Sequence, residues 1–137
     1  MMNTGTGTSS YQQTKILYIE DNKVNIQLVK RSLGTMGYHL TIAEDGNNGL
    51  IKATQLLPQV ILLDIDLPSI DGITVLRSLK TNFATKDIPV IMYSTQDDSQ
   101  IQSLCQQYGA DAFLSKPTSH GKLLRTIQML LPVDIAY

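Results

Sequence analysis

Short apolar runs alternate with segments of helical period along most of this chain. The apolar runs predict five strands, at residues 16–19, 38–43, 59–63, 88–93 and 112–114. Apolar residues that recur every three or four positions predict helices at about 24–33, 47–57, 73–79, 100–108 and 119–130. Because each crossover between parallel strands is right-handed and lays its helix on the sheet, this alternation predicts an α/β domain with a parallel sheet covered on both faces.

One domain accounts for the folded part of the chain. The 137 residues are 42% hydrophobic, which is enough for a single core of ordinary size. Residues 1–14 have almost no apolar side chains and predict a flexible tail. We therefore expect a domain over residues 15–131 and a short C-terminal tail over residues 132–137.

Charge and cysteine content exclude several classes of protein. The 11 Lys and Arg against 12 Asp and Glu give a formal net charge of −1, so no overall basic field favours nucleic acid or an anionic membrane. Cys105 is the single cysteine and cannot form an intrachain disulfide. No segment resembles a secretory signal or a transmembrane helix, so we expect a soluble, cytoplasmic protein without a membrane partner.

The third predicted strand ends abruptly on an acid. Its apolar run is followed by Asp64, Ile65 and Asp66, and then by Pro68. Burying an unpaired carboxylate costs several kcal/mol, so we expect Asp64 at the carboxyl end of the strand, facing a crevice. Taken alone, such an acid is more often a cap that starts the next turn.

Polar side chains that follow the other strands change this interpretation. Glu20 and Asp21 follow the first strand, Ser94 ends the fourth, and Lys116 follows the fifth. The carboxyl ends of parallel strands lie on one edge of the sheet, which brings these residues near Asp64. Each has an ordinary explanation as a first-turn acid, a helix cap or a surface charge, but their coincidence is much less expected.

Carboxylates gathered at one edge need cations. At about 5 Å and an effective dielectric constant near 20, each pair repels by roughly 3 kcal/mol. Oxygen ligands with an incomplete protein shell suit Mg²⁺, and Lys116 adds a second positive charge. An acid nucleophile, a divalent ion, a lysine and a hydroxyl are the parts needed for phosphoryl transfer, so we predict transient phosphorylation of Asp64.

In combination and order, the motifs resemble the receiver domain of two-component response regulators. The motifs are Ile-Leu-Tyr-Ile-Glu-Asp-Asn at 16–22, Leu-Asp-Ile-Asp-Leu-Pro at 63–68 with Asp-Gly at 71–72, Ile-Pro-Val-Ile-Met-Tyr-Ser at 88–94, and Gly-Ala-Asp-Ala-Phe-Leu-Ser-Lys-Pro at 109–117. The resemblance covers about Lys15 to Leu131. It implies a doubly wound, flavodoxin-like sheet of strand order 2-1-3-4-5, an order that the strand pattern alone does not give.

The resemblance also implies a role for each residue at the strand ends. Asp64 would accept phosphate from a sensor histidine kinase, a phosphotransfer protein or a small phosphodonor. Asp21, Asp64 and the backbone carbonyl of Asp66 would ligate Mg²⁺, with Glu20 acting mainly through water. Lys116 would pair with Asp64 or its phosphoryl group, and the peptide bond after Lys116 would be cis.

A second group of residues would switch and tune the domain. Ser94 would donate its hydroxyl to the phosphoryl group, and Phe113, which stands where Tyr is frequent in the family, would follow the movement. Thr95 stands where the family often has Ala, and its bulk can obstruct that movement. Asp66 and Gln96 occupy positions that tune attack by water on the phosphoaspartate, with an effect whose sign the sequence does not predict.

Because no effector domain follows in this sequence, we expect a stand-alone receiver without a DNA-binding domain, whose output is a contact with a downstream protein. The surface of the fourth helix, fifth strand and fifth helix is the candidate for that contact and for a homodimer. Four apolar residues have helical spacing there, although core packing is favoured for them: Ile101, Leu104, Leu123 and Ile127. In the first helix, we expect Val24, Leu28, Val29 and Leu33 on the inner face.

Two other functions stay open. The Asp64-Ile65-Asp66 segment resembles the nucleophile and acid of haloacid dehalogenase-type phosphatases, although that family places the pair on its first strand. A degenerate receiver could act only as a binding scaffold, but Asp21, Asp64, Ser94 and Lys116 are all present. We favour a protein that is not an enzyme and promotes only its own phosphorylation and dephosphorylation.

Overall fold

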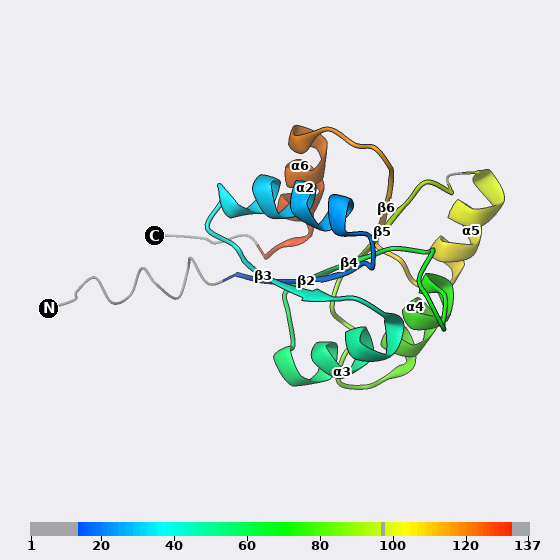
Figure 1. Cartoon of the computed structure of the whole chain (residues 1–137). Coiled ribbons are helices and arrows are strands. Elements are labelled where there is room, and N and C mark those ends of the chain that lie inside the picture. The colour runs from blue at the N-terminus through cyan, green and yellow to red at the C-terminus, as the bar shows by residue number, and fades with distance from the viewer. Residues whose placement is uncertain (1–13, 97, 133–137) are drawn as a thin grey trace, which may run out of the picture.

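Five parallel strands form a single sheet in the order β3-β2-β4-β5-β6 (Figure 1). The structure, a computed structural model, describes residues 14–96 and 98–132. The strands are β2 (Lys15–Ile19), β3 (His39–Ala43), β4 (Val60–Leu63), β5 (Val90–Ser94) and β6 (Ala112–Ser115). The helices are α2 (Lys23–Gly34), α3 (Gly46–Leu56), α4 (Gly72–Thr81), α5 (Ser99–Gln107) and α6 (His120–Leu130). Counted along the chain, the strand order is 2-1-3-4-5, which confirms the predicted fold.

Helices cover both faces of the sheet. Helices α2 and α6 lie on one face, and α3, α4 and α5 lie on the other (Figure 1). Alternate strand residues enter different cores, so Tyr18 packs with α2 and α6 whereas Leu17 and Ile19 pack on the opposite side. Strands covered on both sides are apolar at nearly every position, and this explains the continuous apolar runs.

The element boundaries differ from the predicted ones by one or two residues. Strand β5 begins at Val90 and not at Ile88, because Pro89 has no N–H to donate to the ladder. Thr14, which we assigned to the tail, extends the pairing of β2 with β3, since its carbonyl accepts the His39 N–H at 2.8 Å. The rest of the predicted tails, residues 1–13 and 133–137, lies outside the described residues.

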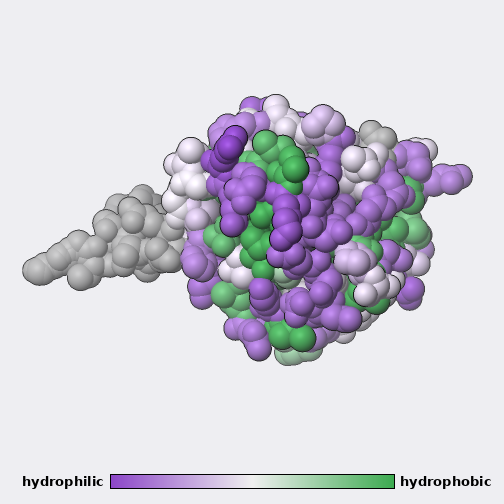
Figure 2. Space-filling view, viewed as in Figure 1, coloured by the Kyte–Doolittle hydropathy of each residue, from purple (hydrophilic) through white to green (hydrophobic). Residues whose placement is uncertain are grey.

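The predicted inner face of α2 was partly wrong. Val29 and Leu33 are buried as expected, together with Ile26, but Val24 and Leu28 are 68% and 55% exposed. Residues 26, 29 and 33 form one stripe at helical spacing, and 24 and 28 form a neighbouring stripe that points outward. Hydrophobic side chains are visible over α2 among hydrophilic ones in Figure 2.

Along the part of the chain that the structure describes, no helix is both long and apolar enough to span a bilayer.

Candidate functional site

The site lies at the carboxyl edge of the sheet. Ile19 in β2 is in register with Leu63 in β4, so the residues that follow them, Glu20 and Asp64, leave adjacent strands side by side. The Asp64 N–H donates to the Ile19 carbonyl at 3.1 Å, which extends this pairing past the end of β4. On the other side of β4, β5 pairs with β6, and the chain after β6 leads directly to Lys116.

Gly72 fixes the loop that follows Asp64. Asp71 caps α4 by accepting the Thr74 N–H at 2.9 Å, and the Gly72 N–H donates to the Ile65 carbonyl at 2.7 Å. A Cβ atom at position 72 would lie 2.1 Å from the Asp64 carbonyl oxygen. Only glycine allows the start of α4 to pack this closely against the backbone of Asp64.

One ammonium group lies between two buried carboxylates. Glu20 is 1% exposed and Asp64 is 4% exposed. The Lys116 Nζ lies 2.5 Å from Oε1 of Glu20 and 3.4 Å from Oδ1 of Asp64. Lys116 was expected to pair with Asp64, and the structure places it closer to Glu20.

The two acids have different environments, and their pKa values shift in opposite directions. Burial opposes ionisation of Glu20, but hydrogen bonds from Lys116 and from the Tyr18 hydroxyl, at 2.8 Å, hold the pKa of this carboxyl below its usual range. For Asp64, burial raises the pKa to about 7, with the Glu20 charge adding to the shift and Lys116 opposing it. Glu20 is therefore the stable anion of the pair, and Asp64 is the carboxylate whose charge is poorly stabilised.

Two tyrosines that the sequence analysis did not single out surround this pair. The Tyr18 ring is fully buried in β2, and burial raises the pKa of its hydroxyl, with the nearby Glu20 adding to this effect. The Lys116 ammonium lies 5.1 Å from the centre of the Tyr93 ring, and the two rings are 6.3 Å apart. A tyrosine inside an apolar strand needs a partner for its hydroxyl, and Tyr18 shares a sheet face with Glu20, two residues on. That spacing could have indicated the contact.

A group of three acids could hold a metal ion. Glu20, Asp21 and Asp64 each offer an oxygen within 4.8 Å of the others. Asp21 is exposed to solvent and the other two are buried. Carboxylate oxygens open to water on one side fit Mg²⁺, which retains several water ligands in proteins.

The predicted switch and tuning residues border the same site. Ser94 is fully buried, and its Oγ accepts the Gln96 N–H at 3.0 Å. The Gln96 side-chain amide donates to the Asp66 carboxylate, which joins the loop after β4 to the loop after β5. Phe113 is half-buried against the core under α3, α4 and α5, and Thr95 is exposed. The Lys116–Pro117 peptide bond is cis, as the resemblance implies.

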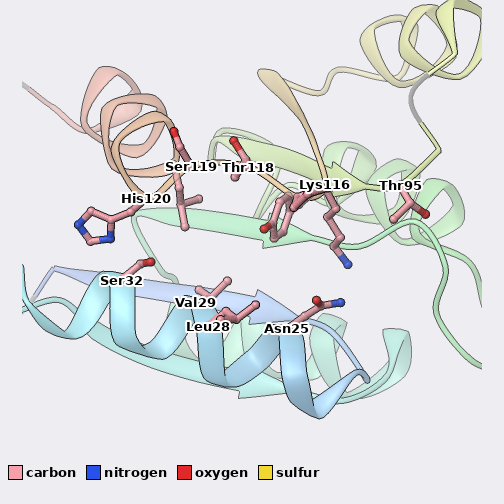
Figure 3. Close-up of a pocket in the computed structure, with 12 residues that line it drawn as sticks. Asn25, Leu28, Val29, Ser32, Thr95, Lys116, Thr118, Ser119 and His120 are labelled. Carbon is pink, nitrogen blue, oxygen red and sulfur yellow. The ribbon is translucent and has the colours of Figure 1, made fainter.

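A cavity of about 420 Å³ opens beside Lys116, between α2 and the segment that leads into α6. Lys116 and Thr95 lie at one end of it, and Ser32 and His120 lie at the other (Figure 3). Leu28, exposed on α2, also lines it. Because Lys116 also contacts Glu20 and Asp64, this end of the cavity adjoins the acidic site.

The candidate apolar contact residues are mainly core residues. Leu123 and Ile127 are buried, and Ile101 and Leu104 are partly buried. Cys105 is 1% exposed, and burial raises the pKa of its thiol, which fits packing and not reactivity.

The fold and the acidic edge of the sheet agree with comparisons to known proteins. A family model of the response regulator receiver domain matches residues 16–128. PilH of Pseudomonas aeruginosa is 32% identical over 117 residues, which cover 85% of this chain and 97% of PilH. The transcriptional regulator RpaA of Synechocystis is 39% identical over 85% of this chain, but the match covers 48% of RpaA, so the chain spans about half the length of that relative.

A solved structure gives the same result. The receiver domain of a sensor histidine kinase from Pseudomonas aeruginosa, with a magnesium ion in its active-site cleft, has a TM-score of 0.80 and 28% identity, over 86% of this chain and 97% of that one. The protein is thus an α/β domain with an acidic site at the carboxyl edge of its sheet. It belongs to the response regulator receiver domain family. This membership supports a role as a phosphorylation-dependent signalling switch.

Proposed function

We propose that this chain is a phosphorylation-dependent switch in which Asp64 accepts the phosphoryl group. The observation that carries the proposal is the position of Asp64, a buried carboxylate with a raised pKa, 3.4 Å from an ammonium group and within a cluster of three acids. A carboxylate that is poorly stabilised as an anion gains from any reaction that places its charge on a better stabilised group.

The chemistry is an in-line transfer to Asp64. An Asp64 carboxylate oxygen forms a bond to phosphorus while the bond from phosphorus to the leaving group breaks. With a phosphohistidine donor, that leaving group is an imidazole nitrogen. Asp21 and Asp64 are the side chains that would hold Mg²⁺ directly, with Glu20 acting mainly through water, and the backbone carbonyl of Asp66 is the further ligand that we propose. The ion, when bound, supplies positive charge for the phosphoryl oxygens.

Lys116 and Ser94 would bind the transferred group. The Lys116 ammonium is already within 3.4 Å of Asp64 and can donate to a phosphoryl oxygen. The Ser94 oxygen accepts a hydrogen bond from the Gln96 N–H, which leaves its own O–H available to donate. Donation to the phosphoryl group would draw Thr95 and its loop inward, with Phe113 following. A reversal of a 1:99 bias between states requires about 5.5 kcal/mol, which several charge-assisted hydrogen bonds can supply together.

Asp66 and Gln96 would set the lifetime of the phosphoaspartate. Their side chains contact each other across the two loops that border Asp64. In this proposal, the Asp66–Gln96 contact affects how readily water reaches the phosphoryl group.

The phosphoryl source in this proposal is a sensor histidine kinase, a phosphotransfer protein or a small phosphodonor. The output is an altered contact with a downstream protein, through a surface that includes α5, β6 and α6 and that can also form a homodimer. In this role the protein promotes only its own phosphorylation and dephosphorylation, and a cytoplasmic location is part of the same proposal.

Intact-mass measurement after incubation with Mg²⁺ and acetyl phosphate tests the function. We expect an adduct of one phosphate on the wild type, none on Asp64→Asn, and retention of the adduct on Asp87→Asn, a control that removes an acid 90% exposed and outside the site. Absence of an adduct with acetyl phosphate and with a panel of phosphorylated kinases would leave only a binding scaffold. Sustained multiple turnovers of a generic phosphoester would instead indicate a phosphatase.

A further inference from the structure

The Tyr18 hydroxyl and the Lys116 ammonium donate to the same oxygen of Glu20. Oε1 of Glu20 lies 2.8 Å from the Tyr18 hydroxyl and 2.5 Å from the Lys116 Nζ. Oε2 accepts the Asn22 N–H at 3.3 Å. Three donors therefore surround a carboxylate that is 1% exposed, and two of them come from β2 and the residues just after it.

We propose that Tyr18 is a positioning residue, whose hydroxyl holds Glu20 in place when Lys116 turns from Glu20 to the phosphoryl group on Asp64. This inference rests on the proposed function. It assigns a role in the reaction to a tyrosine that touches neither the phosphoryl group nor its donor.

The distances show why such a residue is needed. Lys116 is nearer to Glu20 than to Asp64, by 2.5 Å against 3.4 Å, so tighter contact with a phosphoryl group on Asp64 draws it away from Glu20. Because Mg²⁺ would reach Glu20 mainly through water, Glu20 would then have no direct cation contact, and such a buried carboxylate is destabilised unless other donors remain. Tyr18 remains, because its ring is 0% exposed and packed in the core under α2 and α6.

The hydroxyl of Tyr18, and not its ring, is the informative group. A core position in β2 needs only an apolar ring, which Phe supplies with almost the same volume. Loss of the hydroxyl removes one of three donors to Glu20 in the resting state, but a larger share of the donors once Lys116 has moved. The loss therefore weakens the phosphorylated state more than the resting state.

Tyr93 offers a matched control. Its ring lies on the same face of the sheet, 6.3 Å from the Tyr18 ring, and contacts the Lys116 ammonium at 5.1 Å. Within residues 14–96 and 98–132, Glu20 accepts no hydrogen bond from the Tyr93 hydroxyl. Tyr93→Phe removes the same chemical group as Tyr18→Phe and retains the ring over Lys116.

The experiment measures binding of beryllofluoride, a stable mimic of the phosphoryl group, at saturating Mg²⁺ by NMR titration. We expect Tyr18→Phe to raise the dissociation constant about three- to tenfold, and Tyr93→Phe to change it less than about twofold. In a Glu20→Gln background, Tyr18→Phe should have little further effect, because the hydroxyl acts through the Glu20 charge.

Two results would overturn the inference. One is a dissociation constant for Tyr18→Phe within twofold of the wild type, and the other is an equal effect of Tyr18→Phe with and without Glu20→Gln, which would indicate a packing role. Urea unfolding of each variant establishes that the measured protein is folded. A wild type that neither binds beryllofluoride nor gains a phosphate adduct would refute the proposed function itself. If the wild type does both, either of the two results above refutes only the role of Tyr18.

Discussion

Two lysines hold carboxylates at opposite ends of the sheet, and the charges around them are balanced differently. Lys80, near the end of α4, lies 2.9 Å from Asp111 and also donates to the Ile88 carbonyl at 2.9 Å. The same Asp111 oxygen accepts the Val90 N–H at 2.9 Å. One cation meets one acid there, and hydrogen bonds tie both of them to the backbone where β5 and β6 begin.

Lys116, at the carboxyl end, is one cation among three acids. It contacts Glu20 and Asp64, and Asp21 lies close enough to share a metal ion with them. Burial raises the pKa of Asp64, the Glu20 charge adds to this shift, and Lys116 only partly offsets it. The difference teaches that a balanced pair joins elements of the fold, whereas an unbalanced acidic cluster is suited to binding a further cation.

Replacing the two lysines should separate these roles with the largest effect. We expect Lys116→Met to slow phosphorylation of Asp64 by about 100-fold or more, because the charge that stabilises the transferred group is lost. Lys80→Met should leave the rate within about twofold, since Lys80 lies at the other end of the strands. The rate of adduct formation with Mg²⁺ and acetyl phosphate, followed by intact mass, measures both. Equal loss in the two variants would show that the ends are not independent.

Asp111 should matter for stability and not for phosphorylation. Asp111→Asn leaves Lys80 without its anion and weakens the bond to the Val90 N–H, so we expect the free energy of unfolding to fall by about 1–3 kcal/mol. The control is Asp87→Asn, which breaks an ion pair to Lys86 whose acid is 90% exposed, and which should cost no more than about 1 kcal/mol. Urea denaturation compares them, and equal losses would contradict the structural role of Asp111.

The sequence predicted one end of the sheet better than the other. Glu20, Asp64 and Ser94 each follow an apolar run directly, and Lys116 follows one after a single residue. Parallel strands bring such positions together, so the proximity of these residues could be inferred without a structure. Asp111 precedes its strand by a single residue and is 31 positions from Lys80, and no local pattern marks that contact.

The sequence also could not predict the distances between side chains within the site. Whether Lys116 lies nearer to Glu20 or to Asp64 depends on differences of about 1 Å between side chains in a packed core. The exposed stripe of Val24 and Leu28 has nearly the same helical spacing as the buried stripe, so only packing against the sheet distinguishes the two.

Burial of the Asp64 carboxyl should make the stability of the fold depend on pH. Its pKa rises from 3.8 in the unfolded chain to about 7 in the fold, so between these values the unfolded state loses a proton that the folded state keeps. Stability from this group is thus lost as the pH rises from 4 to 7. We expect Asp64→Asn, which cannot ionise, to be more stable than the wild type by about 1–3 kcal/mol at pH 8 without divalent ions, and by much less at pH 5. Urea unfolding at the two pH values measures this, and a gain that is equal at both would disprove the assignment.

Mg²⁺ should stabilise the fold by adding positive charge among the three acids. This is the smallest effect that we predict. An ion that binds only the folded state stabilises it by about 1.4 kcal/mol at ten times its dissociation constant. Asp21 is the informative position, because it is exposed and its replacement leaves the buried Glu20–Lys116 contact intact. Asp21→Asn should therefore lose the stabilisation by Mg²⁺ with little change in stability in EDTA, whereas Asp111→Asn should retain it at lower overall stability. If Mg²⁺ stabilises Asp21→Asn as much as the wild type at every concentration, the ion binds elsewhere and the carboxyl end does not depend on it.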